Sequence, residues 1–207
     1  MNISVAVVGH VARQNQAHHL SRRLGARLFL DNGELGELEN HRRAWSWGQV
    51  AGGRWHLVIQ DDAVPIPRML DHLNAGLTYY LPSPGLVSLY LGTSYPTHWQ
   101  RRIRRVLDHA NDAAWIRSDH LLHGVAVAAP TSWIRPILHH RSDLPYDEHL
   151  GEWARGAGHP IWYTRPSLVD HEDGPSLIDH PDGLRREKPR HAWHVGVPEW
   201  NDRTIQL

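Results

Sequence analysis

Short apolar runs alternate with amphipathic segments along most of this chain. The runs predict strands at residues 3–8, 26–30, 55–59, 86–91, 122–129 and 161–163. The segments between them predict helices over residues 14–24, 37–47, 67–77, 98–111, 130–139 and 147–157. The runs are nearly continuous in apolar residues, which is typical of strands buried on both faces of a parallel sheet. The pattern therefore predicts an α/β, Rossmann-like fold with a mostly parallel central sheet flanked by helices.

The apolar pattern weakens toward the C-terminal end of the chain. The 207 residues are most simply one domain with a proper core. Proline, charge and histidine dominate the last part without clear periodicity. We therefore expect one domain over residues 1–183 and an irregular tail over residues 184–207. Trp193 and Trp200 predict that this tail packs on the domain or mediates assembly.

Composition narrows the picture only slightly. The formal net charge is zero and there are no cysteines, so disulfides, thiolate chemistry and cysteine-type zinc sites are excluded. The positive charge is almost entirely arginine, and Lys188 is the only lysine. Neither a signal-peptide pattern nor an apolar run of about eighteen residues is present. We expect a cytoplasmic protein without membrane insertion.

The most informative stretch is the strand over residues 55–59 with the acids that follow it. Asp61 and Asp62 come at its C-terminal end, the edge at which open α/β sheets bind ligands. Side chains of neighbouring residues on an extended chain point to opposite faces, so we expect two different roles for the two acids. One can reach Mg²⁺ or Mn²⁺, which favour oxygen ligands and neutralise phosphates. A strand followed by an Asx turn explains the same residues.

Two further strand ends carry candidate binding residues. Gly9, His10 and Arg13 follow the first strand, where glycine lets backbone approach a ligand and arginine can meet a phosphate. An ordinary strand–helix turn is the alternative, and the segment matches neither a dinucleotide-binding nor a P-loop motif. Asp31 ends the second strand, where an acid can accept a hydrogen bond from a ribose hydroxyl. The Asp-Asn-Gly turn explains Asp31 equally well.

Acidic and histidine residues near the end of the chain supply the remaining candidates. Asp147 and Glu148 open a helix and include a candidate general base, although helix capping also explains Asp147. His171 lies in an Asp-His-Glu-Asp run and can join Asp62 as a metal ligand. The alternative interpretation is that His171 lies beside these acids by chance, because the chain holds 18 histidines.

Two basic helices have simpler interpretations. The segment at residues 40–43, which contains His41, is most simply a solvated basic face. Arg101, Arg102, Arg104 and Arg105 place four cations within five residues. A solvated helix explains them, and contact with a nucleic acid or phosphate is the alternative.

Together these pieces resemble glycosyltransferases of the GT-A fold, and more narrowly family 25, the lipopolysaccharide and collagen galactosyltransferase type. The resemblance rests on Gln60-Asp61-Asp62-Ala63, on Gly33-Glu34-Leu35-Gly36 and on Asn40-His41-Arg42-Arg43-Ala44-Trp45. Weaker matches are His123 to Ala128, Asp147 with Leu150, Pro166 to Val169 and Ser176 to Ile178. Gln60 stands where the family has an acid, and Asn40 where it has a serine. The match spans residues 3 to 178, and a viral (phage) member would suit the small, arginine-rich chain.

The resemblance implies an inverting, metal-dependent transfer of a sugar from a nucleotide-diphosphate sugar, a UDP-sugar first of all, to a hydroxyl acceptor. It implies Asp62 and His171 as ligands of Mn²⁺ or Mg²⁺ and Asp147 or Glu148 as the base. Donor binding falls to Val8, Gly9, His10, Arg13, Asp31, His41 and Asp61. The acceptor, a glycan, a protein or a modified DNA base, stays open. A viral member would act in the cytoplasm of its host cell.

Two other functions are compatible with the same sequence. One is a glycosyltransferase acting on a hydroxylated base in DNA, which the arginines at 101–105 favour. The other is a GT-A-like binding module without turnover, which Gln60 and the short chain leave open.

Overall fold

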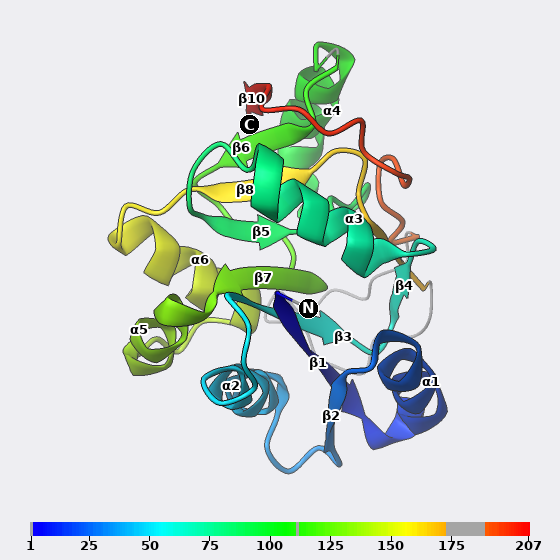
Figure 1. Ribbon diagram of the computed structural model, residues 1–207, viewed down its shortest axis with the longest axis vertical. Coiled ribbons are helices and arrows are strands. Elements are labelled where there is room, and N and C mark those ends of the chain that lie inside the picture. Colours follow the sequence, from blue (N-terminus) through cyan, green and yellow to red (C-terminus); the bar gives the residue numbers. More distant parts are fainter. Residues whose placement is uncertain (1, 111, 173–188) are drawn as a thin grey trace.

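The computed structural model describes residues 2–110, 112–172 and 189–207, which form one large twisted sheet with helices on both sides (Figure 1). The order of the eight strands in this sheet is β10-β6-β8-β5-β7-β3-β1-β2. A separate pair joins β4 (Ala63–Pro65) to β9 (Val169–His171). The large sheet comprises β1 (Ile3–His10), β2 (Arg27–Asp31), β3 (Trp55–Gln60), β5 (Leu86–Ser88), β6 (Trp115–Ser118), β7 (Ala126–Pro130), β8 (Ile161–Thr164) and β10 (Thr204–Gln206).

Within the large sheet, parallel strand pairs outnumber antiparallel ones. β1 runs parallel to both β2 and β3, β5 is parallel to β8, and β10 is parallel to β6, which makes four parallel pairs. The three antiparallel pairs are β3–β7, β5–β7 and β6–β8. The predicted α/β fold with a mostly parallel central sheet flanked by helices is confirmed.

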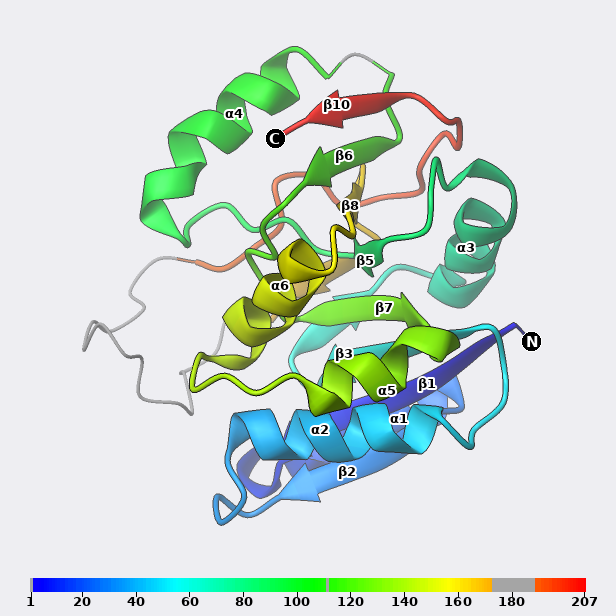
Figure 2. The same cartoon turned by 90° about the vertical axis from the view of Figure 1, so that its left-hand side faces the viewer.

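Helices cover both faces of the sheet and close two hydrophobic cores (Figure 2). One core joins alternate strand residues such as Val5 and Val7 to Leu20 of α1 and Leu73 of α3. The other joins Ala6 and Val8 to side chains of α2, α4, α5 and α6. Both faces of β1 and β3 are therefore buried, which explains their continuous apolar sequence. The helices are α1 (Gln14–Leu24), α2 (Glu37–Gly48), α3 (Met69–Ala75), α4 (Gln100–Asp108), α5 (Ile134–His139) and α6 (Tyr146–Gly156).

Single-turn segments account for most differences from the predicted helix bounds. Short 3₁₀ turns at residues 11–13, 97–99 and 131–133 lead into α1, α4 and α5, and a π-turn at residues 76–80 follows α3. α1 ends at Gly25, which adopts the left-handed conformation (φ 60°) that glycine tolerates best.

The C-terminal segment contributes to the sheet, which the sequence did not predict. Thr204–Gln206 forms β10, so the expectation of an irregular tail is wrong for these residues. β6, its neighbour, was also missed, since three or four residues are too short to show periodicity. Trp200 lies 4.9 Å from Trp115 between ring centroids. Residues 184–188 lie outside the described residues, so the boundary after residue 183 stays a prediction.

Among the described residues, none of the helices has the length and apolar character needed to cross a bilayer.

Candidate functional site

The two acids after β3 lie in a turn and are both buried. Asp61 and Asp62 are 4% and 5% exposed, and β4 begins directly after them. β4 pairs antiparallel with β9, which places Ala63 opposite His171. The pairing of two short strands about a hundred residues apart in sequence therefore brings Asp62 and His171, the predicted metal ligands, together. Because Asp61 and Asp62 belong to a turn, the expectation that they face opposite sides does not hold, and both contact Arg13.

Asp61 ties the ends of β1 and β3 together. Its Oδ2 accepts a hydrogen bond from the backbone N–H of His10 at 2.9 Å, and its Oδ1 lies 3.1 Å from Nη2 of Arg13. Burial raises the pKa of Asp61 to about 6, although Arg13 opposes this shift. Gly9 makes the close approach feasible, because a Cβ there would lie 2.9 Å from Asp61 Oδ2 and from Ala17 Cβ. The segment after β1 is thus built around Asp61.

Asp62 has one engaged and one free oxygen. Its Oδ2 accepts a hydrogen bond from Nη1 of Arg13 at 2.6 Å and lies 3.4 Å from Nε2 of His171. Its Oδ1 is buried and has no hydrogen-bond partner in the part of the chain that the structure describes. Nδ1 of His171 lies 2.6 Å from the carbonyl oxygen of Glu172, and a carbonyl only accepts, so Nδ1 carries the proton. In the neutral ring the lone pair of Nε2 therefore faces the carboxylate of Asp62, an arrangement that a shared cation stabilises.

Two further carboxyl groups, those of Glu37 and Asp147, have a raised pKa in this part of the molecule. Glu37, at the start of α2, accepts a hydrogen bond from Nε2 of Gln60 at 3.1 Å. Burial, with the nearby charges of Asp147 and Asp62, raises the pKa of Glu37 to about 7. Burial likewise raises the pKa of Asp147 to about 6. The carboxyl groups of Glu37, Asp62 and Asp147 are thus close enough for Asp62 and Asp147 to raise the pKa of Glu37, and such a gathering of acids favours binding of a cation.

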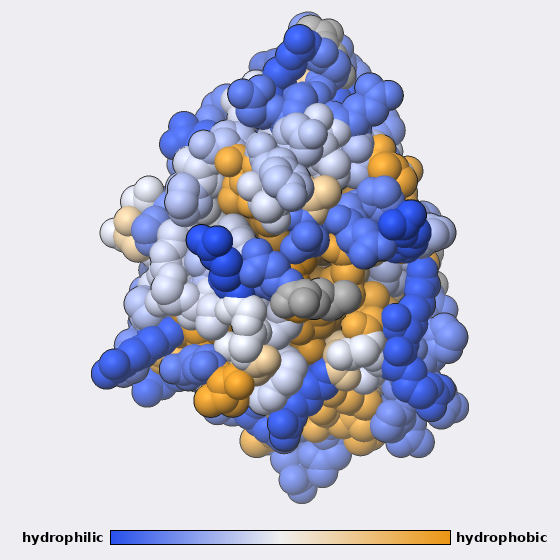
Figure 3. Space-filling view, in the orientation of Figure 1, coloured by the Kyte–Doolittle hydropathy of each residue, from blue (hydrophilic) through white to orange (hydrophobic). Residues whose placement is uncertain are grey.

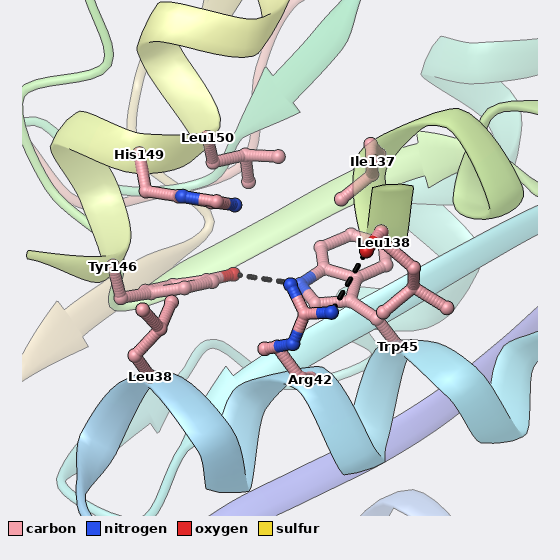
Figure 4. Close-up of a pocket in the computed structure, with 8 residues that line it drawn as sticks. All are labelled: Leu38, Arg42, Trp45, Ile137, Leu138, Tyr146, His149 and Leu150. Carbon is pink, nitrogen blue, oxygen red and sulfur yellow. Dashed lines mark hydrogen bonds between the residues drawn. The ribbon is translucent and has the colours of Figure 1, made fainter. Parts of the chain in front are cut away.

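Tyr146 fixes the position of Asp147 at the start of α6. Its hydroxyl oxygen accepts a hydrogen bond from the indole N–H of Trp45 on α2 at 3.2 Å (Figure 4). On its other side, a Cβ on Gly124 would lie 2.6 Å from the tyrosine ring, so only glycine fits there. The guanidinium of Arg42 ties α2 to α5 through the carbonyl of Leu138 (2.7 Å). α2, α5 and α6 therefore form one frame that carries both Glu37 and Asp147.

The cavity drawn in Figure 4 lies inside this frame. Its volume is about 10 Å³, and its lining is mainly apolar. That is room for a single water at most, so we interpret it as a packing gap rather than a substrate site.

His41 and Asn40 correct the expectation of a solvated basic face on α2. His41 is 2% exposed and its ring stacks on Tyr146 at 3.6 Å between centroids. Its Nδ1 donates to the carbonyl of Glu37 at 2.8 Å, its Nε2 is buried without a partner, and burial lowers its pKa to about 4. Asn40 donates from Nδ2 to the carbonyls of Gly9 and Phe29. Both side chains thus face inward, because this face of α2 packs on β1 and β2.

The other predicted residues lie at or near the same edge of the sheet. Asp31 accepts hydrogen bonds from the N–H groups of Leu35 and Gly36 with its two oxygens, as expected for a loop brace. Burial tends to raise the pKa of Asp31, but the backbone hydrogen bonds to its carboxylate outweigh burial, so the pKa is lowered. The side chain of Val8 is buried in the core, and its backbone lies between β2 and β3 in the sheet. Glu148 is exposed, and its N–H donates to Asp147 Oδ1. Asp173 and the segment 176–178 lie outside the described residues.

Glu37, Gln60 and His123 belong to the site but were not predicted. Glu37 precedes His41 by four residues, a helical spacing that could have indicated a shared face. His123 gave no signal, because its position depends on contacts between loops. Its Nε2 accepts a hydrogen bond from the N–H of Gly92 at 3.1 Å, and its ring lies 4.9 Å from that of Tyr90. Burial, with the neighbouring His171, lowers the pKa of His123 to about 3.

The protein side chains of this site supply only some of the ligands that a divalent cation needs. Within the described residues, no group of three or more histidine, aspartate or glutamate side chains is arranged as a complete metal site. Asp62, with its unpaired Oδ1, and His171 supply two ligands. Mg²⁺ sites of enzymes that act on nucleotides are commonly completed by substrate phosphates and water, so two protein ligands suffice.

Comparisons with known proteins support the fold. No protein-family model matches the chain, and no curated protein sequence matches it. A197 from STIV is similar in structure, with a TM-score of 0.57 over 93% of this chain and 96% of that chain. The two sequences are only 9% identical, so the likeness concerns the fold alone.

Two glycosyltransferases show weaker structural similarity. A mutant of Drosophila β1,4-galactosyltransferase 7, in complex with manganese, UDP-Gal and xylobiose, gives a TM-score of 0.46 at 12% identity, covering 91% of this chain and 82% of that one. A glycosyltransferase involved in the glycosylation of the major capsid of PBCV-1 gives 0.31 at 11% identity, covering 69% of each chain. These scores are too low to carry a functional argument, which must come from the site itself.

Proposed function

We propose that this protein is a metal-dependent, inverting glycosyltransferase that moves a sugar from a nucleotide-diphosphate sugar, most simply a UDP-sugar, to a hydroxyl group. The observation that carries the proposal is the meeting of Asp62 and His171 at the C-terminal end of β3. Ligands of open α/β sheets bind at that end of the strands. Asp62 belongs to Gln60-Asp61-Asp62-Ala63, one of the short motifs that resemble family 25, and the resemblance supplies the inverting stereochemistry.

The donor would lie across the ends of β1 and β3. The segment after Gly9 would lie beside the donor, and Arg13 can turn from the aspartates to the diphosphate. Asp61 positions this segment through His10 and Arg13, which makes its role structural. Asp31 would act on the ribose through the loop it braces. His41 would hold Glu37 and Tyr146 in position through its hydrogen bond to the carbonyl of Glu37 and its stacking on Tyr146.

Asp62 and His171 would hold Mn²⁺ or Mg²⁺ together with the donor diphosphate. When bound, such an ion neutralises the charge that the leaving diphosphate develops. The buried, partnerless Oδ1 of Asp62 and the Nε2 lone pair of His171 are the groups that suit this role. The nearby carboxyl groups of Glu37 and Asp147 would add to the negative potential that attracts the cation.

Asp147 would act as the general base. In the reaction, the acceptor oxygen bonds to the anomeric carbon, and the bond from that carbon to the diphosphate oxygen breaks. The electron pair leaves with the nucleoside diphosphate, and the hydroxyl proton goes to the carboxylate of Asp147. A pKa near 6 suits a base that must be ionised yet accept a proton near neutral pH. Glu148 is exposed at the next position and is the second candidate.

Release of nucleoside diphosphate tests the proposal with three variants. Asp62→Asn should abolish transfer and donor binding, because the carboxylate charge is lost. Asp147→Asn should keep donor binding but lower turnover by about 10²- to 10⁴-fold. Asp71→Asn is the matched control, since Asp71 is an exposed acid paired only with Arg68 on α3. Transfer that survives in Asp62→Asn would contradict the metal site. Nucleotide binding by the wild type without any turnover would instead indicate a binding module.

A further inference from the structure

α4 presents a concentrated positive charge in a chain whose net charge is zero. Arg101, Arg102, Arg104 and Arg105 are all exposed on this helix. The end of the molecule that contains α4, at the top of Figure 1, is coloured mainly as hydrophilic in Figure 3. We call these four residues the α4 arginine surface.

No described acidic side chain neutralises the α4 arginine surface. Among the described residues, none of these four side chains forms an ion pair, whereas Arg13, Arg42, Arg68 and Arg203 each do. Arg102 lies 5.1 Å from the ring centroid of Trp99, and Arg104 lies 5.3 Å from that of Trp193. Cations interleaved with aromatic rings are typical of surfaces that bind nucleic-acid strands.

The opposite face of α4 excludes a lipid bilayer as the partner. Ile103 is fully buried, and Val106 and Leu107 pack against the same core. A basic helix binds a membrane by inserting its apolar face among the lipids. Here that face is already used inside the protein, so only charge is offered to a partner in water.

A chain of contacts links α4 to the candidate site. Nε2 of Gln100, the first residue of α4, donates to the carbonyl of Gly92 at 3.1 Å. The N–H of Gly92 donates to His123. His123 packs on Tyr90, whose ring lies 6.0 Å from that of His171. These contacts join the first residue of α4 to His171 through the protein interior, so α4 is fixed in place relative to the candidate site.

We propose that the α4 arginine surface binds the phosphate backbone of a nucleic acid. Polyanion binding by arginine is driven by release of condensed counterions, and free, clustered arginines suit it. Resting on the proposed function, the acceptor is then a hydroxyl group carried by that nucleic acid, such as one on a modified base.

Fluorescence anisotropy with a labelled oligonucleotide, measured without donor or metal, tests the binding. The wild type should bind, with an affinity that falls steeply between about 50 and 200 mM salt. Arg101→Gln with Arg105→Gln should weaken binding about tenfold and reduce the salt slope by about two, one for each lost phosphate contact. These two arginines contact no aromatic ring among the described residues, so the fold should be retained.

Arg22→Gln with Arg135→Gln is the matched control, because it removes two exposed arginines from other helices and changes the net charge equally. An equal loss in both double variants would show that only overall charge matters and would overturn the proposal. No binding by the wild type at low salt, or equal binding to anionic vesicles, would also overturn it. Because neither donor nor metal is present, failure of the proposed transferase activity leaves this result unaffected.

Discussion

At the scale of single residues, burial rather than residue type sets the chemistry of the site. Three carboxyl groups there, those of Glu37, Asp61 and Asp147, have a raised pKa mainly because they are buried. Perturbed carboxyl groups gathered at a strand end are typical of functional sites. Among these three, Asp147, near the start of α6, is the one proposed as the base.

The raised pKa of Asp147 predicts an acid limb in the rate profile. The carboxylate must be ionised to accept a proton, and it is increasingly protonated below its pKa of about 6. We expect kcat/KM for sugar transfer to fall about tenfold per pH unit below that value. Measurement from pH 5 to 8 at saturating metal checks this. A rate that stays level or rises toward pH 5 would contradict the base assignment.

Glu37→Gln should stabilise the folded protein at high pH. The folded pKa of Glu37, about 7, lies above its ordinary value of 4.5, so folding favours the protonated form. The penalty is absent below the ordinary pKa of 4.5, grows as the pH rises from there to about 7, and is constant above that. We expect a gain of about 2 kcal/mol at pH 8, after allowance for partial exposure, and little change at pH 4. Denaturant melts at both pH values give the comparison, and an equal gain at both would contradict the pKa shift.

Sequence reasoning found the acids that end strands but missed those that only the fold brings together. Asp61 and Asp62 were identified because the apolar run of β3 stops at them. Glu37 was missed because its environment depends on Gln60 from β3 and Asp147 from α6. Asn40 and His41 were interpreted as exposed for the same reason, since the packing of α2 is not visible locally.

At the scale of elements, the contact of β1, α1 and β3 depends on the lack of a side chain at Gly9. Gly9→Ala would place a Cβ against both Asp61 and Ala17. We expect a loss of about 1–3 kcal/mol of folding stability from this overpacking. We also expect weaker nucleotide binding than in the wild type, because Asp61 must move. Gly156→Ala is the control, as a Cβ there meets nothing within 4 Å. Equal melting temperatures for the two variants would refute the packing argument.

The pair of β4 and β9 shows the limit of prediction for elements. Most helices and the longer strands followed from periodicity, with shifts at their ends. β4 and β9 have three residues each and are about a hundred residues apart, so neither has a local signal. Their pairing nevertheless places His171 beside Asp62. The sequence suggested these two residues as partners through their chemistry, while their proximity comes only from the tertiary structure.

At the scale of the whole molecule, the C-terminal segment closes one end of the sheet. Trp200 packs on Trp115 and against Gly76, where a Cβ would lie 2.6 Å from the indole ring. Trp200→Ala should therefore lower the free energy of unfolding by about 3 kcal/mol. Val197→Ala, at a residue that is 54% exposed, should change it little. Chemical denaturation compares them, and similar stability of both variants would show that the tail is not part of the cooperative fold.

The central claim is that the end of β3 binds a nucleotide diphosphate together with a divalent cation. Thermal unfolding with a panel of nucleotide diphosphates and nucleotide sugars, with and without Mn²⁺, tests it most directly. A ligand that binds only the native state stabilises it by about 2.7 kcal/mol at a hundred times its Kd. We predict a rise in Tm with one nucleotide that requires Mn²⁺, is lost in Asp62→Asn and is retained in Asp71→Asn. No rise with any nucleotide would contradict the claim and leave Asp61 and Asp62 as a buried turn held by Arg13.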